Sequence, residues 1–311
     1  MIKKYLVTGG AGFIGSNIVE ALLKKGCEVK VLDNFSTGKR ENLKKFGNDI
    51  ELIEGDVRSY HTVKQAVLGV EVVLHQAALP SVPRSIADPI TSNDVNVNGT
   101  LNVLDASKDC GVKRVVFASS SSIYGDTPEL PKHEKMMPNP LSPYAVSKLA
   151  GEKYCQVFSR VHGLHTIALR YFNVFGPNQD PNSQYSAVIP KFIKAIMNDE
   201  RPVIYGNGTQ TRDFTYVDNV VEANLIAAEK DCESGLVMNC ACNEQIILNE
   251  LVNEINYYFS KNVKPIYETI RKGDIKHSYA DIRLIKEFLG FEPVTKFKKG
   301  IEKTINYFKQ L

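Results

Sequence analysis

The sequence predicts an α/β fold in which a doubly wound parallel sheet is accompanied by a smaller C-terminal α/β domain. Two observations carry this prediction. Short apolar runs alternate with longer amphipathic segments through the first half of the 311 residues, which is typical of parallel strands joined by helices. A glycine-rich turn also separates the first apolar run from the first amphipathic segment. We therefore expect a ligand site at the carboxyl ends of the strands.

The predicted elements follow this order along the chain. The first domain, residues 1–175, has strands at 3–8, 28–33, 50–54, 70–75, 113–118 and about 166–171, with a long helical stretch at 93–110. The second domain, residues 176–311, has helices at 187–197, 218–230, 248–259 and 296–308. Some of its segments are expected to return to the first domain. The second domain is expected to cap the sheet and to bind substrate in the cleft between them.

The composition is that of an ordinary globular enzyme. Hydrophobic residues make up 43% of the chain and charged residues 23%, and the formal net charge of +3 is too small to indicate nucleic acid. No apolar run approaches the roughly 20 residues of a membrane span, and the N-terminus enters a strand directly instead of resembling a signal peptide. The six cysteines and the histidines lack metal spacing, so we expect free thiols, a cytoplasmic protein and no metal.

The glycine-rich turn predicts a dinucleotide site. Gly9, Gly12 and Gly15 fit Gly-x-x-Gly-x-x-Gly between a strand and a helix, where bare backbone approaches a pyrophosphate and the helix N-terminus favours its charge. The second strand ends in Asp33, whose carboxylate is placed to accept hydrogen bonds from the adenosine ribose and to repel a 2′-phosphate. NAD is therefore favoured, although Lys39 and Arg40 keep NADP open.

The other residues expected at the cofactor follow the same strand ends. Asp56 is placed for the adenine edge, and small residues after the fourth strand let backbone approach the dinucleotide. The set consists of Phe13, Ile14, Asn34, Ser36, Thr37, Gly38, Asp56, Val57, Gln76, Ala77 and Ala78.

A tyrosine and a lysine at helical spacing form the candidate catalytic pair. Ser142-Pro143 predicts a helix start, which places Tyr144 in the first turn and Lys148 one turn further along the same face. A phenolate at neutral pH needs a pKa lowered by roughly 3 units, and a nearby cation and the helix N-terminus both act in that direction. Taken alone, the pair also fits a core tyrosine and a solvated lysine. The serine run 119–122, at the end of the fifth strand, adds hydroxyls at the same sheet edge.

Together, the glycine loop, the strand-end serine and Tyr144-x-x-x-Lys148 resemble the extended short-chain dehydrogenase/reductase family, whose sheet is a Rossmann fold. The segments 119–126, 139–144 and 169–177 resemble nucleotide-sugar 4-epimerases, and the resemblance covers essentially the whole chain. It implies that the catalytic serine is Ser120, four residues before Tyr124. Related dehydratases and decarboxylases carry acids at the positions of Ser121 and Ser122, so C4 epimerisation is the reaction that remains.

The resemblance also implies a UDP-sugar site. Asn173 and the two arginines Arg212 and Arg271 would meet the diphosphate, Asp274 would meet the ribose, and Tyr205 would pack on the uracil from a hairpin at 203–208. The residues expected around the sugar are Pro80, Ser121, Ser122, Ala187, Val188 and Ser278.

The small side chains of Ser278 and Ala187 favour UDP-N-acetylglucosamine and UDP-N-acetylgalactosamine, with UDP-glucose and UDP-galactose as a further pair. Pro80 could instead narrow the pocket, and Arg84 keeps a UDP-uronic acid open. An NAD(P)-dependent 4-ketoreductase also stays open, as does, more remotely, a non-catalytic NAD sensor. A homodimer is implied through helices at 93–110 and 144–162 that pack as a four-helix bundle, with no nucleic-acid or membrane partner.

Overall fold

A seven-stranded sheet forms the centre of the protein in the computed structural model, which describes residues 3–181, 187–270 and 276–310. All its strands are parallel, in the order β11-β6-β5-β4-β1-β2-β3. The strands are β1 (Lys4–Thr8), β2 (Glu28–Asp33), β3 (Ile50–Glu54), β4 (Val72–His75), β5 (Arg114–Ser120), β6 (His165–Tyr171) and β11 (Leu236–Cys240). The predicted fold class is confirmed.

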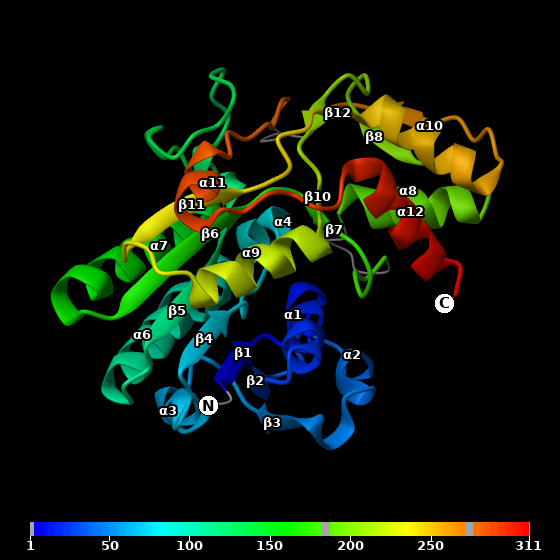
Figure 1. The fold of residues 1–311 in the computed structure, drawn as a ribbon. Coiled ribbons are helices and arrows are strands. Elements are labelled where there is room, and N and C mark those ends of the chain that lie inside the picture. The colour runs from blue at the N-terminus through cyan, green and yellow to red at the C-terminus, as the bar shows by residue number, and fades with distance from the viewer. Residues whose placement is uncertain (1–2, 182–186, 271–275, 311) are drawn as a thin grey trace.

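Helices cover both faces of this sheet (Figure 1). One face packs on α1 (Phe13–Lys24) and α9 (Val217–Glu229), and the other packs on α3 (Tyr60–Val67), α6 (Gly99–Asp109) and α7 (Pro143–His162). Neighbouring strand residues such as Val116 and Phe117 belong to separate hydrophobic clusters, because successive side chains point to opposite faces. This double burial explains why the strands are continuous apolar runs.

The helix predicted at 93–110 begins earlier than expected. Asp88 caps α5 (Pro89–Asn93) by accepting a hydrogen bond from the Thr91 N–H at 3.1 Å, with Pro89 at the first helical position. A π-helical segment, Asp94–Asn98, then joins α5 to α6. The shorter helices are α2 (Glu41–Lys44), α4 (Val82–Ala87) and α11 (Arg283–Leu289), and 3-10 turns lie at Gly47–Asp49 and Ser121–Tyr124.

The C-terminal region is built from three longer helices and small sheets. Helices α8 (Val188–Met197) and α12 (Phe297–Phe308) both pack against α10 (Leu248–Phe259). Within the described residues, paired short strands are β7 (Val174–Phe175) with β10 (Thr215–Tyr216), β8 (Val203–Tyr205) with β13 (Ile266–Glu268), and β9 (Thr211–Arg212) with β12 (Ile246–Ile247). The chain between them returns to the central sheet as α9 and β11, while the domain boundary at 175 stays a prediction.

The hairpin predicted at 203–208 is wrong. β8 pairs in parallel with β13, a strand about 60 residues further along the chain. Gly206 and Gly208 do turn the chain, with φ values of 102° and 77°, but they lead it into β9, which pairs with β12. The chain therefore turns after β8, but the turn does not join β8 to a hairpin partner.

Candidate active site

A cleft of about 580 Å³ opens at the carboxyl ends of the central strands. It lies where the strand order reverses between β1 and β4, the position at which open α/β sheets bind ligands. Its wall contains these residues predicted for the cofactor: Gly9, Gly12, Phe13, Ile14, Asp33, Asn34, Ser36, Thr37, Val57, Gln76, Ala77, Ala78, Tyr144 and Lys148. The structure thus brings together segments that are far apart in the chain.

The glycine loop is close-packed in a way that admits no side chains. Gly9 has a φ of 69°, and a Cβ there would lie 2.7 Å from the Ala77 nitrogen. A Cβ on Gly15 would lie 2.1 Å from the Gly9 carbonyl oxygen. Strand β1, the loop and α1 can therefore fit together only with glycine at these positions, and the N-terminus of α1 lies beside the cleft.

Asp33 stands at the end of β2 with its carboxylate fixed. Its Oδ2 accepts a hydrogen bond from the Ala11 N–H at 2.9 Å and its Oδ1 accepts one from the Phe35 N–H at 2.8 Å. Burial raises the pKa of this carboxyl, and the two backbone N–H groups act in the opposite direction. Gly38 is not part of the cleft wall. It packs closely against Asp33, because a Cβ added to Gly38 would lie 3.0 Å from Asp33 Oδ1.

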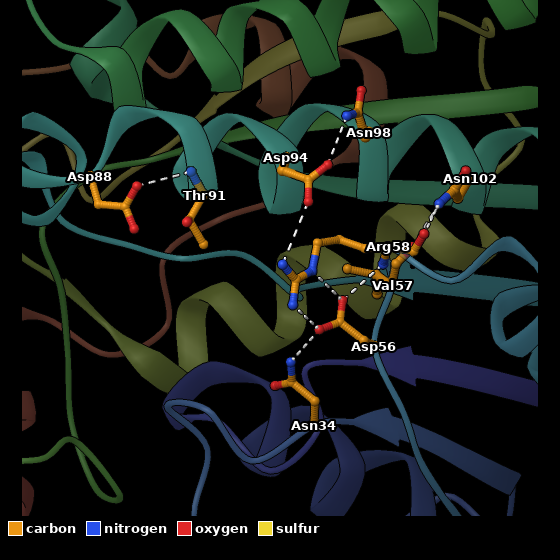
Figure 2. A network of polar contacts seen from close by, with 9 residues as sticks. All are labelled: Asn34, Asp56, Val57, Arg58, Asp88, Thr91, Asp94, Asn98 and Asn102. Atoms are coloured by element: carbon orange, nitrogen blue, oxygen red, sulfur yellow. Dashed lines mark hydrogen bonds and ion pairs between the residues drawn. The ribbon is translucent and has the colours of Figure 1, made fainter.

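Asp56 belongs to an ionic network at the edge of the cofactor cleft and not to its wall (Figure 2). Its Oδ2 accepts hydrogen bonds from Arg58 and from Asn34, both at 2.8 Å. Arg58 holds the pKa of Asp56 at about 2, and its Nη1 lies 3.5 Å from Asp94 on the segment before α6. Asn102 donates to the Val57 carbonyl at 2.9 Å, which fixes the backbone that faces the cleft.

Helix α7 presents the candidate catalytic pair as the sequence predicts. Ser142 caps the helix by accepting a hydrogen bond from the Ala145 N–H at 3.1 Å. Tyr144 and Lys148 both line the cleft, and the Lys148 ammonium donates to the Ala118 carbonyl on β5 at 2.8 Å. Ser120, at the end of β5, lies close enough to the Tyr144 phenol to act on its pKa. The three predicted catalytic residues therefore lie near one another where α7 meets the end of β5, although Ser120 itself is not part of the cleft wall.

Burial controls the proton affinity of this group. Burial raises the pKa of Tyr144, and the hydrogen bond with Ser120 offsets part of that rise. Burial also lowers the pKa of Lys148 to about 8. For the chain by itself the net shift of the Tyr144 pKa is therefore upward, because desolvation, which the sequence-based expectation left out, outweighs the groups that lower it. A cation bound in the cleft would act in the lowering direction.

The rim of the same cleft carries part of the predicted sugar site. Pro80 and Ala187 line it, together with Ser81 and Arg84. Ser81 adopts a φ of 99°, an uncommon backbone conformation for a residue other than glycine, and it caps α4. The segment after β4 that contains this turn forms part of the cleft wall.

The other predicted sugar residues lie outside the cleft wall. Ser121 and Ser122 form the 3-10 turn after β5, and the Ser122 hydroxyl donates to Ser120 Oγ at 2.9 Å. Asn173 follows β6 with a φ of 36° and donates to the Asp213 carbonyl at 3.0 Å. Val188 begins α8.

Arg212 and Ser278 are brought together by backbone pairing. The Ser278 N–H donates to the Thr211 carbonyl at 3.1 Å, and Arg212 Nη1 donates to the Lys276 carbonyl at 3.2 Å. Tyr205, at the end of β8, lies on the same chain connection and accepts from Gln210 through its carbonyl. The predicted residues Arg271 and Asp274 lie outside the described residues.

Sequence reasoning missed the segment after β7, which reaches across to the glycine-loop helix. Gln179 and Asp180 line the cleft, and Asp180 forms an ion pair with Lys39 at 3.1 Å. Asn178 donates to Ser16 Oγ on α1 at 3.0 Å, which joins the two halves of the molecule. Nothing local in the sequence signals these long-range contacts. The missed cleft residue Ser119, by contrast, lies within the serine run that was noted.

Comparisons with known proteins agree with this geometry. Residues 5–241 match the model of the NAD-dependent epimerase/dehydratase family, so the chain belongs to that family and its cofactor is NAD. A UDP-N-acetylglucosamine 4-epimerase from Methanobrevibacter ruminantium M1, solved with UDP-N-acetylmuramic acid, is 42% identical with a TM-score of 0.95 and coverage of 100% of this chain and 99% of that one.

Two other solved structures define the range of sugars among the relatives. The UDP-glucose 4-epimerase of Thermotoga maritima, solved with UDP-glucose, is 36% identical with a TM-score of 0.94 and coverage of 99% of both chains. The UDP-glucuronic acid 4-epimerase of Bacillus cereus, solved with UDP-glucuronic acid and NAD, is 32% identical with a TM-score of 0.92 and the same coverage.

The residues present fit NAD. The glycine loop leaves bare backbone at the N-terminus of α1, and the Asp33 carboxylate stands at the end of β2, where it suits a ribose diol. Ala77 and Ala78 line the cleft next to the loop, where their small side chains leave space for the dinucleotide. None of the helices in the described parts of the chain is long and apolar enough to cross a membrane.

Proposed function

We propose that this protein is a 4-epimerase of UDP-sugars that interconverts UDP-N-acetylglucosamine and UDP-N-acetylgalactosamine, with UDP-glucose and UDP-galactose as a second pair. The observation that carries the proposal is the Ser120, Tyr144 and Lys148 group beside the NAD cleft. Serines at 121 and 122 support epimerisation over elimination or decarboxylation, which need an acid there. The nearby Glu152 carboxylate is occupied by Arg170 at 2.8 Å.

In the proposed mechanism, Tyr144 takes the proton of the sugar 4-hydroxyl while Ser120 hydrogen-bonds the same oxygen. When bound in this cleft, NAD⁺ would supply the acceptor for the C4 hydride and the donor that returns it to the opposite face. Lys148 keeps a positive charge beside Tyr144, with its Nζ 5.9 Å from the tyrosine ring centroid. The 4-keto sugar turns over within the cleft, and Tyr144 then returns the proton to the new 4-hydroxyl.

The diphosphate, the uridine and the sugar are each assigned a set of residues. Arg212, whose guanidinium suits phosphate oxygens, is proposed to hold the diphosphate together with Asn173 and Arg271. Tyr205 and Asp274 are proposed for the uridine. Ser278 and Ala187 leave room for an N-acetyl group, which supports the choice of substrate. The relative that is a UDP-N-acetylglucosamine 4-epimerase supports it as well.

A UDP-uronic acid is the second candidate substrate because Arg84 lines the same cleft as Tyr144. A guanidinium at that wall is suited to a sugar carboxylate. The UDP-glucuronic acid 4-epimerase of Bacillus cereus supports this second candidate.

We also propose a homodimer that works in the cytoplasm. Side chains that are apolar and exposed gather on α4, α5 and α7, where Ile86 is 62% exposed, Ile90 81% and Val161 69%. Such a surface supports pairing with a second copy. The six cysteines are free, as predicted, which supports a reducing compartment. Light scattering at the monomer mass would contradict the dimer.

The test is a proton NMR time course on the purified protein without added cofactor, with each UDP-sugar in its own tube. We expect UDP-N-acetylglucosamine to give the galacto product through resident NAD⁺. Conversion of UDP-glucose alone would overturn the choice of substrate, and conversion of UDP-glucuronate alone would establish the second candidate. If added NAD(P)⁺ is instead reduced in proportion to the sugar and the reaction stops at the 4-keto sugar, the protein is a 4-ketoreductase running in reverse and the proposal fails.

A further inference from the structure

Helix α7 is fixed to the end of β5 at consecutive strand residues. The Ala118 carbonyl accepts from the Lys148 ammonium at 2.8 Å, and Ser120 lies close enough to Tyr144 to act on its pKa. Between them, the Ser119 hydroxyl donates to Glu152 Oε1 at 2.6 Å. The helix residues are one turn apart, so one helical face meets one strand end. The contact of Ser119 has no place in the mechanism described so far.

Glu152 is buried and is held from a second strand. It is 1% exposed and receives two hydrogen bonds of 2.8 Å from the Arg170 guanidinium on β6, one to each carboxylate oxygen. Arg170 is itself 4% exposed. Removing one member of a buried, bidentate pair leaves the other charge uncompensated, so this geometry is strongly restrained.

Arg170 is in turn packed against Tyr124, on the turn after β5. Its guanidinium lies 4.7 Å from the ring centroid of Tyr124, whose hydroxyl donates to Asn239 Oδ1 at 2.7 Å. Asn239 then donates to the Asp281 carbonyl at 3.0 Å, just beyond the segment that contains Ser278. The ion pair therefore has a defined position relative to both the strand ends and the sugar wall.

We propose that Glu152, held by Arg170, is a positioning residue for the Ser120–Tyr144 pair. It holds the end of β5 in place through Ser119. This sets the position of the adjacent Ser120 hydroxyl relative to the Tyr144 phenol. Glu152 and Arg170 do not line the cleft, so they act through Ser119 and Ser120 and not on substrate. The proposal rests on the proposed function for its kinetic readout.

Ser119→Ala is the first variant because it removes only the hydroxyl and leaves the Glu152–Arg170 pair intact. A misplacement near 1 Å at a reacting group can lower rate about 100-fold. We expect kcat to fall about 10- to 100-fold, while the KM for the UDP-sugar and the NAD content stay within about twofold. Ser159→Ala is the matched control, since Ser159 lies on α7 and bonds Ser234 away from the cleft.

A double-mutant cycle separates positioning from a general structural role. If Ser119 acts through Ser120, Ser119→Ala in a Ser120→Ala background should change kcat less than about twofold, because no hydroxyl remains to be positioned. Multiplying effects in the double variant would overturn the proposal, and so would wild-type kcat in Ser119→Ala alone. Glu152→Gln should behave like Ser119→Ala. If it does not fold, the Glu152→Met/Arg170→Met double variant removes both charges at similar volume.

A measurement without substrate keeps this proposal independent of the proposed function. The absorbance titration of Tyr144 is obtained as wild type minus Tyr144→Phe, and it reports the Ser120 bond that lowers the tyrosine pKa. Lys148 faces the tyrosine from its own helix, and Arg84 and Tyr171 share the cleft; all are unchanged in the variant. We expect Ser119→Ala to raise the Tyr144 pKa as Ser120→Ala does. An unchanged titration would contradict positioning even if no UDP-sugar is converted.

Discussion

The cofactor end and the proposed nucleotide-sugar end of the cleft are built from different structural elements. At the cofactor end, backbone and buried strand ends do the binding: Gly9 and Gly15 are close-packed, and Asp33 is 8% exposed with both oxygens hydrogen-bonded. At the proposed nucleotide-sugar end, long side chains such as Arg212 lie on two-stranded sheets and connecting loops. A rigid backbone cradle suits a cofactor that stays bound, whereas adjustable side chains suit a substrate that exchanges at every turnover.

Tyr144 stands where the two ends meet, and its loss should have the largest effect. Tyr144→Phe removes the proposed proton acceptor, so we expect kcat to fall by about 1,000-fold, within the range of general acid–base catalysis. NAD content and melting temperature should match the wild type. The control is Tyr257→Phe, because Tyr257 is 77% exposed on α10. Near-normal turnover of Tyr144→Phe would remove this residue from the proton-transfer role.

Gly15→Ala should weaken NAD binding at the cofactor end and leave UDP binding at the sugar end nearly unchanged. The added Cβ would lie 2.1 Å from the Gly9 carbonyl oxygen, so the loop and α1 must separate. We expect NAD affinity to weaken by about 100-fold, or about 2.7 kcal/mol, and the protein to purify without cofactor. UDP binding, followed by calorimetry, should change little.

Gly26→Ala is the comparison for Gly15→Ala. Gly26 has a φ of 73°, but a Cβ added there would meet no atom within 4 Å, so only backbone strain is added. This variant should lose about 1 kcal/mol of stability and keep its NAD. Full NAD retention by Gly15→Ala would contradict the description of the cofactor end as a close-packed backbone cradle.

Ser278→Tyr should change only which UDP-sugar the enzyme prefers, and it should leave the cofactor end unaffected. A tyrosine fills space that we assign to the N-acetyl group, so kcat/KM for UDP-N-acetylglucosamine should fall by about 30-fold or more. Activity on UDP-glucose should fall much less. Ser278→Ala, which adds no volume, serves as the control. Equal losses on both sugars would show that Ser278 does not govern the N-acetyl group.

Asp213 gives an effect of a different kind, a pH dependence of stability at the sugar end. Its carboxylate accepts hydrogen bonds from the backbone N–H groups of Cys242 and Ala280, and burial raises its pKa to about 7. Between pH 4 and 7 the folded state then holds a proton that the unfolded state releases, so this group's contribution to stability falls as pH rises, by up to about 4 kcal/mol.

Asp213→Asn removes that titration. Denaturant unfolding at several pH values should show the wild type's stability, relative to the variant, decreasing from pH 4 to 7. Asparagine also presents an amide to backbone donors, which adds a pH-independent loss. A difference between the two proteins that does not vary with pH would mean that Asp213 is already ionised at pH 4.

The same contrast explains what the sequence could and could not predict. The cofactor end follows from local patterns, because Gly9, Gly15 and Asp33 sit at strand ends whose parallel pairing brings them to one edge. The sugar end depends on pairings between distant segments. The parallel pairing of β8 with β13 and the ion pair of Lys39 with Asp180 have no local signal, so the hairpin was wrong and the segment after β7 was missed.

The pKa of Tyr144 also could not be predicted from local sequence patterns. Spacing was enough to place Lys148 one turn from Tyr144, but the burial that raises the tyrosine pKa depends on the whole packed structure. The early start of the helix at Pro89 was also missed, although Asp88 and Pro89 form a recognisable cap.

The most direct test of the central claim is to run the reaction in D₂O with UDP-N-acetylglucosamine and to analyse both sugars by NMR and mass spectrometry. In the proposed mechanism the C4 hydrogen is held on the enzyme as a hydride and returns to the same carbon. The product should therefore keep its original hydrogen at C4 and carry no deuterium on carbon. Deuterium at C4 would show that the hydrogen leaves as a proton. That result would contradict the role assigned to the NAD cleft and to Tyr144.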